Sequence, residues 1–165
     1  MRYTVLPRVL VFVYKNGKLL MMKYSGEGEH QTQEKADRKD VYNPIGGHVE
    51  MGEDIVGAAI REAKEEAGVN LLNVKVKGVI NASGFAGKNI MNFIISGETT
   101  DEPIKSSLEG ELVWINPTEI DSLNVFPDLK SIMEKLNSMI SSQIFSGTAQ
   151  FNGRFGLEKI TLQTV

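Results

Sequence analysis

The sequence predicts a single mixed α/β domain in which a β-sheet is flanked by helices. Two patterns favour this class: β-branched and aromatic runs of strand length recur along the chain, and two longer stretches carry apolar residues at helical spacing. The length of 165 residues is enough for one domain with a proper core and too short for two ordinary domains. Because the sequence shows no internal repeat and no linker, we expect one domain over residues 1–165.

A β-hairpin is expected at the beginning of the chain. Residues 9–14 are β-branched and aromatic, as in a buried strand. Asn16-Gly17 provides a tight turn, and residues 19–24 return as the partner strand. The polar stretch 25–42 that follows is unusually long for a loop in a compact domain. Two interpretations of this stretch stay open: a solvated insertion, or a lid that contacts substrate.

An amphipathic helix is predicted over residues 53–67. Its apolar stripe consists of Ile55, Val56, Ala59, Ile60, Ala63 and Ala67. A glycine-rich turn at residues 43–47 precedes the helix, and Gly68 is suited to end it as a C-terminal cap. We expect the stripe to pack on the sheet while the neighbouring carboxylates line the rim of a cleft.

The remaining elements follow from the same patterns. Strands are expected near residues 74–80, 89–97 and 111–115. A second helix is expected to begin near Pro127, a residue favoured in the first turn. Its expected buried face consists of Leu129, Ile132, Met133, Leu136 and Ile140. The tail predicts a final hairpin, with strands at 149–151 and 157–162 around Asn152-Gly153.

The composition narrows the function classes. The 41% hydrophobic and 24% charged residues are typical of a soluble globular protein, and the absence of cysteine excludes disulfides and thiolate metal sites. A net charge of -3 gives no general attraction to nucleic acid polymers or anionic membranes. No stretch has membrane-spanning length, and the N-terminal apolar run lacks a cleavage-type site. We therefore expect a cytoplasmic protein, monomeric or homodimeric, that binds neither membranes nor nucleic acid polymers.

Three glutamates on the first predicted helix are the most informative feature. Glu62 and Glu66 stack one turn apart, with Glu65 beside them. Like charges this close repel one another unless a cation lies among them, and a hard divalent cation bound by carboxylate oxygens supplies that charge. The alternative is a solvated acidic helix face.

The spacing around these glutamates resembles the signature box of the Nudix hydrolases, at residues 47–69. The matching pattern is Gly47, five residues, Glu53, seven residues, Arg61-Glu62-Ala63, one residue, Glu65-Glu66, one residue, Gly68-Val69. Ala63 stands where the family usually carries a larger aliphatic residue. The resemblance implies an α/β/α sandwich with a mixed sheet, flanking helices and a C-terminal β-hairpin. It also implies an enzyme that hydrolyses phosphoanhydride bonds in nucleoside diphosphates linked to another group.

The expected cofactor is Mg²⁺, for which Mn²⁺ is able to substitute. Divalent cations neutralise and orient phosphates and acidify a bound water. The carboxylates of Glu62, Glu65 and Glu66 are hard oxygen donors that suit these ions better than Zn²⁺. In the family, the carbonyl oxygen at the position of Gly47 joins the metal shell.

Arg61 and a loop carboxylate complete the expected catalytic set. Arg61 precedes Glu65 by four residues and is expected either to aim Glu65 or to stabilise the helix by pairing with Glu53 or Glu65. The segment 107–114 resembles the loop where many family members place an additional acid. Glu109 is the preferred general base, with Glu111 second and Glu62 also open. An ordinary exposed turn residue is the alternative for both loop acids.

Weaker resemblances point to the branch of the family that hydrolyses oxidised purine nucleoside triphosphates. Tyr-Asn-Pro-Ile-Gly-Gly at 42–47 resembles a segment in which the Asn, here Asn43, helps hold the purine. Phe-Pro-Asp at 126–128 resembles a segment whose aromatic residue, here Phe126, stacks on the base while the acid, here Asp128, reads its edge. Residues 145–151 resemble the closing hairpin. Core packing for Phe126 and a helix N-terminal charge for Asp128 are the alternatives.

The leading hypothesis is Mg²⁺-dependent cleavage of a nucleoside triphosphate, such as 8-oxo-dGTP or a related purine nucleotide, to monophosphate and pyrophosphate. This activity belongs to nucleotide pool sanitation. One alternative is hydrolysis of another nucleoside diphosphate derivative, such as ADP-ribose or a dinucleoside polyphosphate. A non-catalytic nucleotide-sensing module is the other, and the intact carboxylates of the box argue against it.

Overall fold

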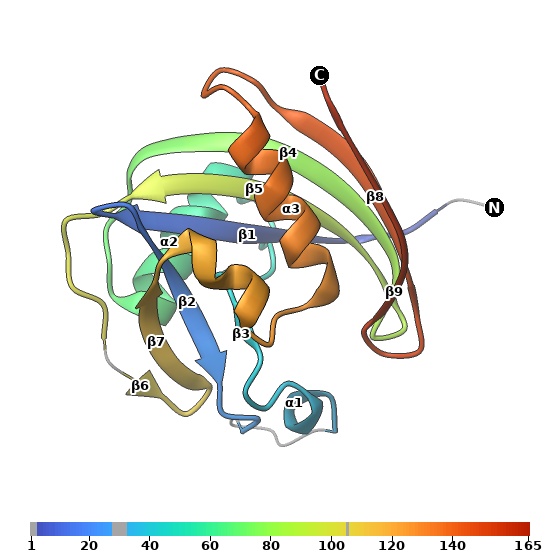
Figure 1. Cartoon of the computed structure of the whole chain (residues 1–165), viewed down its shortest axis with the longest axis horizontal. Helices are drawn as coiled ribbons and strands as arrows, with labels where there is room; N and C mark the ends of the chain where they lie inside the picture. The colour runs from blue at the N-terminus through green and yellow to red at the C-terminus, as the bar shows by residue number, and fades with distance from the viewer. Residues whose placement is uncertain (1–2, 28–32, 105) are drawn as a thin grey trace.

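The computed structural model describes residues 3–27, 33–104 and 106–165 (Figure 1). Nine strands form one sheet in the order β6-β7-β2-β1-β5-β4-β8-β9, and β3 pairs with β2. The strands are β1 (Leu6–Lys15), β2 (Lys18–Tyr24), β3 (Tyr42–Asn43), β4 (Leu72–Phe85), β5 (Lys88–Glu98), β6 (Ser106–Ser107), β7 (Gly110–Ile115), β8 (Phe145–Asn152) and β9 (Gly156–Thr164). The helices are α1 (Gln33–Asp37), α2 (Ile55–Ala67), α3 (Pro127–Ser138) and a 3-10 helix, η1 (Pro117–Ser122).

The sheet has an apolar core on each face. Along β1, Val9, Val11 and Val13 belong to the core under α2, while Phe12 belongs to the core under α3. This alternation follows from the two-residue period of a strand. Figure 1 shows α3 in front of the sheet and α2 behind it. The sheet is mixed, because β1–β5 and β4–β8 are parallel and the other ladders are antiparallel. The predicted α/β/α sandwich is therefore confirmed.

Both predicted hairpins are present. Asn16 and Gly17 have φ values of 51° and 76°, as a two-residue turn with two left-handed positions requires, and they connect antiparallel β1 and β2. At the end of the chain, β8 and β9 pair antiparallel and β8 adds to β4, so the tail extends the sheet.

The expected loop at 25–42 contains secondary structure. Helix α1 and strand β3 lie within it, while residues 28–32 of this stretch are outside the described part of the chain. Strand β3 pairs Asn43 with Met22 of β2. After β3 the chain runs antiparallel beside β1, where Val9 and Val11 donate to the carbonyls of Gly47 and Ile45 at 2.9 and 2.8 Å. The glycine turn is thereby held against the central strand.

Helix α2 begins and ends at well-defined caps. The Asp54 side chain accepts hydrogen bonds from the backbone N–H of Val56 and Gly57, so the helix begins two residues later than predicted. At its other end Gly68 adopts a left-handed φ of 71° and donates to the carbonyls of Ala63 and Lys64. This confirms the predicted glycine cap.

The buried face of α2 differs from the predicted stripe at one position. Ile60 is 45% exposed, whereas Ala58 is buried and Glu62 is only 8% exposed. At 100° per residue, the face that contacts the sheet is centred between Ala59 and Glu62, and Ile60 lies to one side of it. The assignment of Ile60 to the buried stripe was therefore wrong, because the helix buries a carboxylate in its place.

Helix α3 begins at Pro127 as predicted and packs on the opposite face of the sheet. Leu129, Ile132 and Met133 are buried, and Leu136 packs against the same core. The assignment of Ile140 to this face was wrong, because the helix ends at Ser138 and Ile140 is 67% exposed. Among the described residues, no helix is long and apolar enough to cross a membrane.

Candidate active site

The acidic face of α2 lines an open cleft of about 990 Å³, part of which is open to solvent. Glu62, Glu65 and Glu66 of α2 line this cleft together with Glu109 from the β6–β7 turn. The cationic side chains of the cleft are Arg8, Arg38, Arg61 and Lys88. The four carboxylates predicted to act in catalysis are thus gathered in one place, although they come from segments more than forty residues apart.

Arg61 is the centre of an ion-pair network at the rim of the cleft. Its Nη1 lies 2.9 Å from Glu62 Oε1 and 3.0 Å from Glu65 Oε2. Its Nε and Nη2 donate to the two oxygens of Glu53 at 2.9 and 3.0 Å, and Nη2 also donates to the His48 carbonyl. The hydrogen bonds to these carboxylates raise the pKa of Arg61, and the hydrogen bond from Arg61 lowers the pKa of Glu53. Arg61 therefore contacts both of its expected partners, Glu65 and Glu53.

Glu66 is held by the glycine turn. The backbone N–H of Gly46 donates to its Oε2 at 3.0 Å. Burial raises the pKa of Glu66 to about 7, and the negative charges of Glu62 and Glu109 act in the same direction against the lowering effect of the Gly46 hydrogen bond. Removal from solvent is therefore the main reason that the Glu66 carboxyl holds its proton more tightly than an exposed glutamate.

Gly47 has no room for a side chain because Glu62 occupies that space. A β-carbon at Gly47 would lie 2.1 Å from Glu62 Oε1 and 2.5 Å from its Cδ. The Gly47 carbonyl, predicted to join a metal shell, accepts the Val9 N–H at 2.9 Å and keeps its second lone pair. The glycine turn therefore fixes the backbone directly beside the buried carboxylate.

The oxygen atoms of Glu62, Glu65, Glu66 and Glu109 are of the chemical type that binds Mg²⁺ or Mn²⁺. All four carboxylates are hard oxygen donors, and no sulfur or imidazole donor is required. Across residues 3–27, 33–104 and 106–165, however, no three acidic or histidine side chains are gathered at coordinating distances. Arg61 holds one oxygen each of Glu62 and Glu65, so an ion would be held by the second oxygen of each carboxylate once these side chains move closer together.

Glu109 and Glu111, the two candidate bases near the β6–β7 turn, differ in whether they line the cleft. Glu109 lines the cleft, and its carbonyl accepts the Ser25 N–H at 2.9 Å, which fixes the turn against the end of β2. Glu111 is exposed in β7, where it pairs with Lys23, and it does not line the cleft. Glu109 is therefore the loop acid that shares a cavity with the α2 carboxylates.

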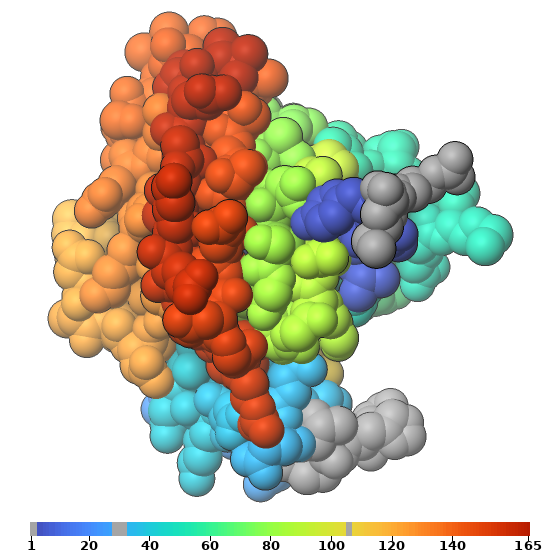
Figure 2. Space-filling view, turned by 90° about the vertical axis from the view of Figure 1, so that its right-hand side faces the viewer, coloured from blue at the N-terminus to red at the C-terminus, as the bar shows by residue number. Residues whose placement is uncertain are grey.

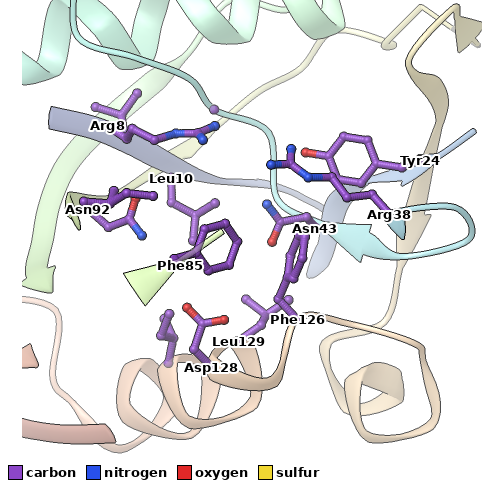
Figure 3. A pocket seen from close by; sticks show the side chains of 14 residues that line it. Arg8, Leu10, Tyr24, Arg38, Asn43, Phe85, Asn92, Phe126, Asp128 and Leu129 are labelled. Carbon is purple, nitrogen blue, oxygen red and sulfur yellow. The ribbon is translucent and has the colours of Figure 1, made fainter. Parts of the chain in front are cut away.

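A second cavity adjoins the cleft and brings together Asn43, Phe126 and Asp128, the three residues predicted to bind a base (Figure 3). The space between its walls is about 550 Å³, which includes open solvent. The two cavities share four lining residues, Arg8, Tyr24, Arg38 and Gly46. We call this second cavity the base pocket, and we call its boundary with the carboxylate cleft, formed by the four shared residues, the pocket mouth.

Phe126 belongs to an aromatic cluster in the base pocket. It meets Phe85 edge-on with centroids 5.4 Å apart, and Phe155 lies 5.2 Å away. Phe126 is only 7% exposed, so it serves core packing and lines the pocket at the same time. Asp128 lies in the first turn of α3, and its burial raises its pKa to about 6 despite backbone hydrogen bonds at the helix N-terminus.

Sequence reasoning missed several residues that line these cavities. Arg8 and Asn92 lie side by side on parallel β1 and β5, and both line the base pocket. A polar residue inside an apolar strand, as Asn92 is, was the available signal for one of them. Arg38 carried no such signal, because a polar stretch does not reveal which of its side chains turns inward.

The sequence profile of the NUDIX domain matches residues 5–136. The chain is 27% identical over 117 residues to the uncharacterized Nudix hydrolase YvcI of Bacillus subtilis (strain 168), a match that covers 68% of this chain and 73% of that protein. The structure is similar to a crystal structure of a MutT protein from Bacillus halodurans, with a TM-score of 0.79, 24% identity, and 96% and 98% of the two chains covered. A NUDIX-family hydrolase from Clostridium perfringens matches with a TM-score of 0.59, 22% identity, and 82% and 98% covered. The two structural matches show a shared fold.

Proposed function

The chain belongs to the NUDIX family of hydrolases, which act on phosphoanhydride bonds, and from this membership we propose that it cleaves a nucleoside triphosphate to a monophosphate and pyrophosphate. The proposed substrate is 8-oxo-dGTP or a related purine nucleotide. One observation carries the proposal: the base pocket with Asn43, Phe126 and Asp128 shares four lining residues with the cleft that holds the α2 carboxylates. A nucleotide with its base in the pocket directs its phosphates toward the carboxylates.

The proposed cofactor is Mg²⁺, with Mn²⁺ as a substitute. Glu62, Glu65, Glu66 and the free lone pair of the Gly47 carbonyl are the groups that would hold it. When bound, such an ion neutralises phosphate charge and acidifies a water molecule. Arg61 binds one oxygen of Glu62 and one of Glu65, which restricts how far either carboxylate has to move to bind an ion.

We assign Glu109 as the general base and the residues of the pocket as the base-binding set. Glu109 stands across the cleft from α2 on a turn anchored to Ser25, which suits removal of a proton from the attacking water. The Asn43 amide offers one donor and one acceptor group to a purine edge, and the Asp128 carboxylate accepts hydrogen bonds above about pH 6. An activity of this kind clears damaged nucleotides from the cytoplasmic pool.

The test is a screen for phosphate and pyrophosphate release with Mg²⁺ across natural and oxidised nucleoside triphosphates, ADP-ribose and dinucleoside polyphosphates, with identification of the products. The proposal expects a monophosphate and pyrophosphate, with the fastest turnover on a purine triphosphate. Cleavage of ADP-ribose or a dinucleoside polyphosphate without turnover of any triphosphate would overturn the substrate assignment. Nucleotide binding without turnover in either Mg²⁺ or Mn²⁺ would indicate a sensing module instead.

A further inference from the structure

Arg38 stands at the boundary between the base pocket and the carboxylate cleft. It lines both cavities, although it comes from residues 33–41, which we call the insertion, and lies outside both the glycine turn and α2. In Figure 3 its side chain extends from the insertion toward the centre of the pocket, beside the Tyr24 ring. A nucleotide with its base in the pocket and its phosphates in the cleft would therefore place its ribose near this guanidinium.

The guanidinium is held mainly by aromatic faces. Its Cζ lies 5.9 Å from the ring centres of Tyr24 and Phe126 and 5.8 Å from that of Phe155. Its Nη2 pairs with Glu34 one turn earlier on the insertion. Stacking on rings leaves the in-plane N–H groups of a guanidinium open to an acceptor.

One of these donors is left unsatisfied. The Arg38 Nε is buried and has no hydrogen-bond partner within the described part of the chain. A buried N–H without an acceptor is costly, and such groups in native proteins usually have a partner that completes them. A guanidinium offers adjacent donors in a planar fork, which matches two oxygens of a phosphate group.

The charges of the cleft favour Arg38 over Arg61 as the partner of a phosphate. Arg61 already donates to Glu53, Glu62 and Glu65, so its N–H groups are occupied. Arg38 pairs with Glu34 alone among the described residues. A polyphosphate that enters a cleft lined by carboxylates therefore meets Arg38 at the pocket mouth, where Arg8 is the second guanidinium that lines both cavities.

The insertion that carries Arg38 is fastened at two further points. Asp37 pairs with Arg154 in the β8–β9 turn, and Glu34 lies 3.7 Å from Lys88 at the start of β5. Figure 2 shows the insertion, in light blue, in contact with the lower end of the β8–β9 hairpin. The insertion is thus part of the wall of the pocket, and Arg38 has a fixed place in it.

We propose that Arg38 binds the phosphate group nearest the ribose of the substrate, and that it thereby selects nucleotides over nucleosides. This inference deepens the proposed function and rests on it, because the position of that phosphate follows from a base in the pocket and a scissile phosphoanhydride in the cleft. Glu34 holds the guanidinium in place from one side, and the phosphate completes its donors from the other.

The experiment compares Arg38→Ala with Lys39→Ala, which removes the same charge from an exposed neighbour that does not line either cavity. Calorimetry without metal measures binding of 8-oxo-2′-deoxyguanosine and of its 5′-monophosphate. Arg38→Ala is expected to weaken binding of the monophosphate by about 10- to 100-fold and to leave the nucleoside within about twofold. Arg38→Lys restores only part of the loss, and Lys39→Ala matches wild type.

Equal losses for nucleoside and monophosphate would overturn the inference, because they would show that Arg38 only supports the aromatic wall. Unchanged binding of both ligands would overturn it as well. Thermal melting confirms that each variant is folded. If the wild-type protein cleaves a different nucleotide, the substrate assignment is refuted. The Arg38 comparison is then run on the nucleoside and monophosphate of the nucleotide that is cleaved. A wild-type protein that binds and cleaves no nucleotide refutes both.

Discussion

The carboxylate of Glu62 lies where a side chain at residue 47 would have to be: a β-carbon on Gly47 would come within 2.1 Å of Glu62 Oε1. The requirement for glycine here is steric, and it arises from a contact between a turn and a helix that are fifteen residues apart. The glycine and the glutamate of the signature box are thus two sides of one contact.

We therefore expect Gly47→Ala to displace Glu62 and lower kcat by about 100-fold, the cost typical of an ångström-scale misplacement at a reacting centre. The measurement is steady-state hydrolysis across a Mg²⁺ titration. Gly57→Ala is the matched control, since its added carbon would meet nothing closer than 3.6 Å. Wild-type kcat in Gly47→Ala would show that Glu62 needs no fixed position.

Glu66→Gln tests the metal assignment. Glutamine keeps an acceptor for the Gly46 N–H but removes the negative charge, so the fold is expected to persist while kcat falls by at least about 100-fold. Circular dichroism melting and product release measure the two effects separately. Glu134→Gln, an exposed position on α3, is expected to behave as wild type. Full activity of Glu66→Gln would refute the role of this carboxylate in metal binding.

Arg61→Ala is expected to weaken Mg²⁺ activation and lower the melting temperature together. Without the guanidinium, Glu53, Glu62 and Glu65 lose their shared cation, and the carboxylates that bind metal lose the restraint that orients them. We expect the Mg²⁺ concentration for half-maximal rate to rise by about 10- to 100-fold. Saturating Mg²⁺ should recover part of the rate. A variant with unchanged Mg²⁺ dependence would limit Arg61 to a role in helix stability.

The two candidate bases, Glu109 in the β6–β7 turn and Glu111 in β7, are predicted to differ in their effect on kcat. Glu109→Gln should lower kcat by about 10²- to 10⁴-fold with little change in KM, as loss of a general base does. Glu111→Gln should leave kcat close to wild type, because that side chain lies outside the cleft. The reverse order of effects would assign the base to Glu111.

Asp128 gives a prediction about stability and pH. Burial raises its pKa from an ordinary 3.8 to about 6 in the folded protein, so between these values the folded state binds more protons than the unfolded state. The free energy of unfolding contributed by this group therefore falls as pH rises from about 4 to about 6, and the full loss is about 3 kcal/mol at about 1.36 kcal/mol per unit.

Asp128→Asn removes this titration. Urea unfolding at a series of pH values should show the variant more stable than wild type above pH 6, with the difference shrinking toward pH 4. Asp121→Asn, in the exposed part of η1, serves as the control. A difference that grows as the pH is lowered would contradict the assignment of a raised pKa to Asp128.

Most of the fold was predictable because local signals agreed with tertiary packing. The Asn16-Gly17 turn, the Gly68 cap and Pro127 at the start of α3 each act through backbone geometry within a few residues. The carboxylates of the box were predictable for the same reason, since their spacing on a helix fixes their shared face. These features depend little on the rest of the chain.

The errors and omissions depend on contacts between distant segments. Ile60 gave an apolar signal, yet α2 rotates Glu62 toward the glycine turn and leaves Ile60 exposed. Ile140 extended a helical pattern past Ser138, where the helix ends. Arg38 was missed because its place is set by rings from β2, α3 and the β8–β9 turn, which sequence spacing does not bring together.

The two apolar cores of the sheet bear on how substitutions can alter the substrate preference proposed for this protein. The base pocket is built largely on the face covered by α3, whereas the carboxylates belong to α2 on the opposite face. If the pocket binds the base as proposed, substitutions on the α3 face, such as at Leu129 or Phe126, can change which base is accepted and leave the packing that holds Glu62 and Glu66 intact. Under the proposed function, base recognition and hydrolysis would then depend on residues on opposite faces of the sheet, and only the residues at the pocket mouth would contribute to both.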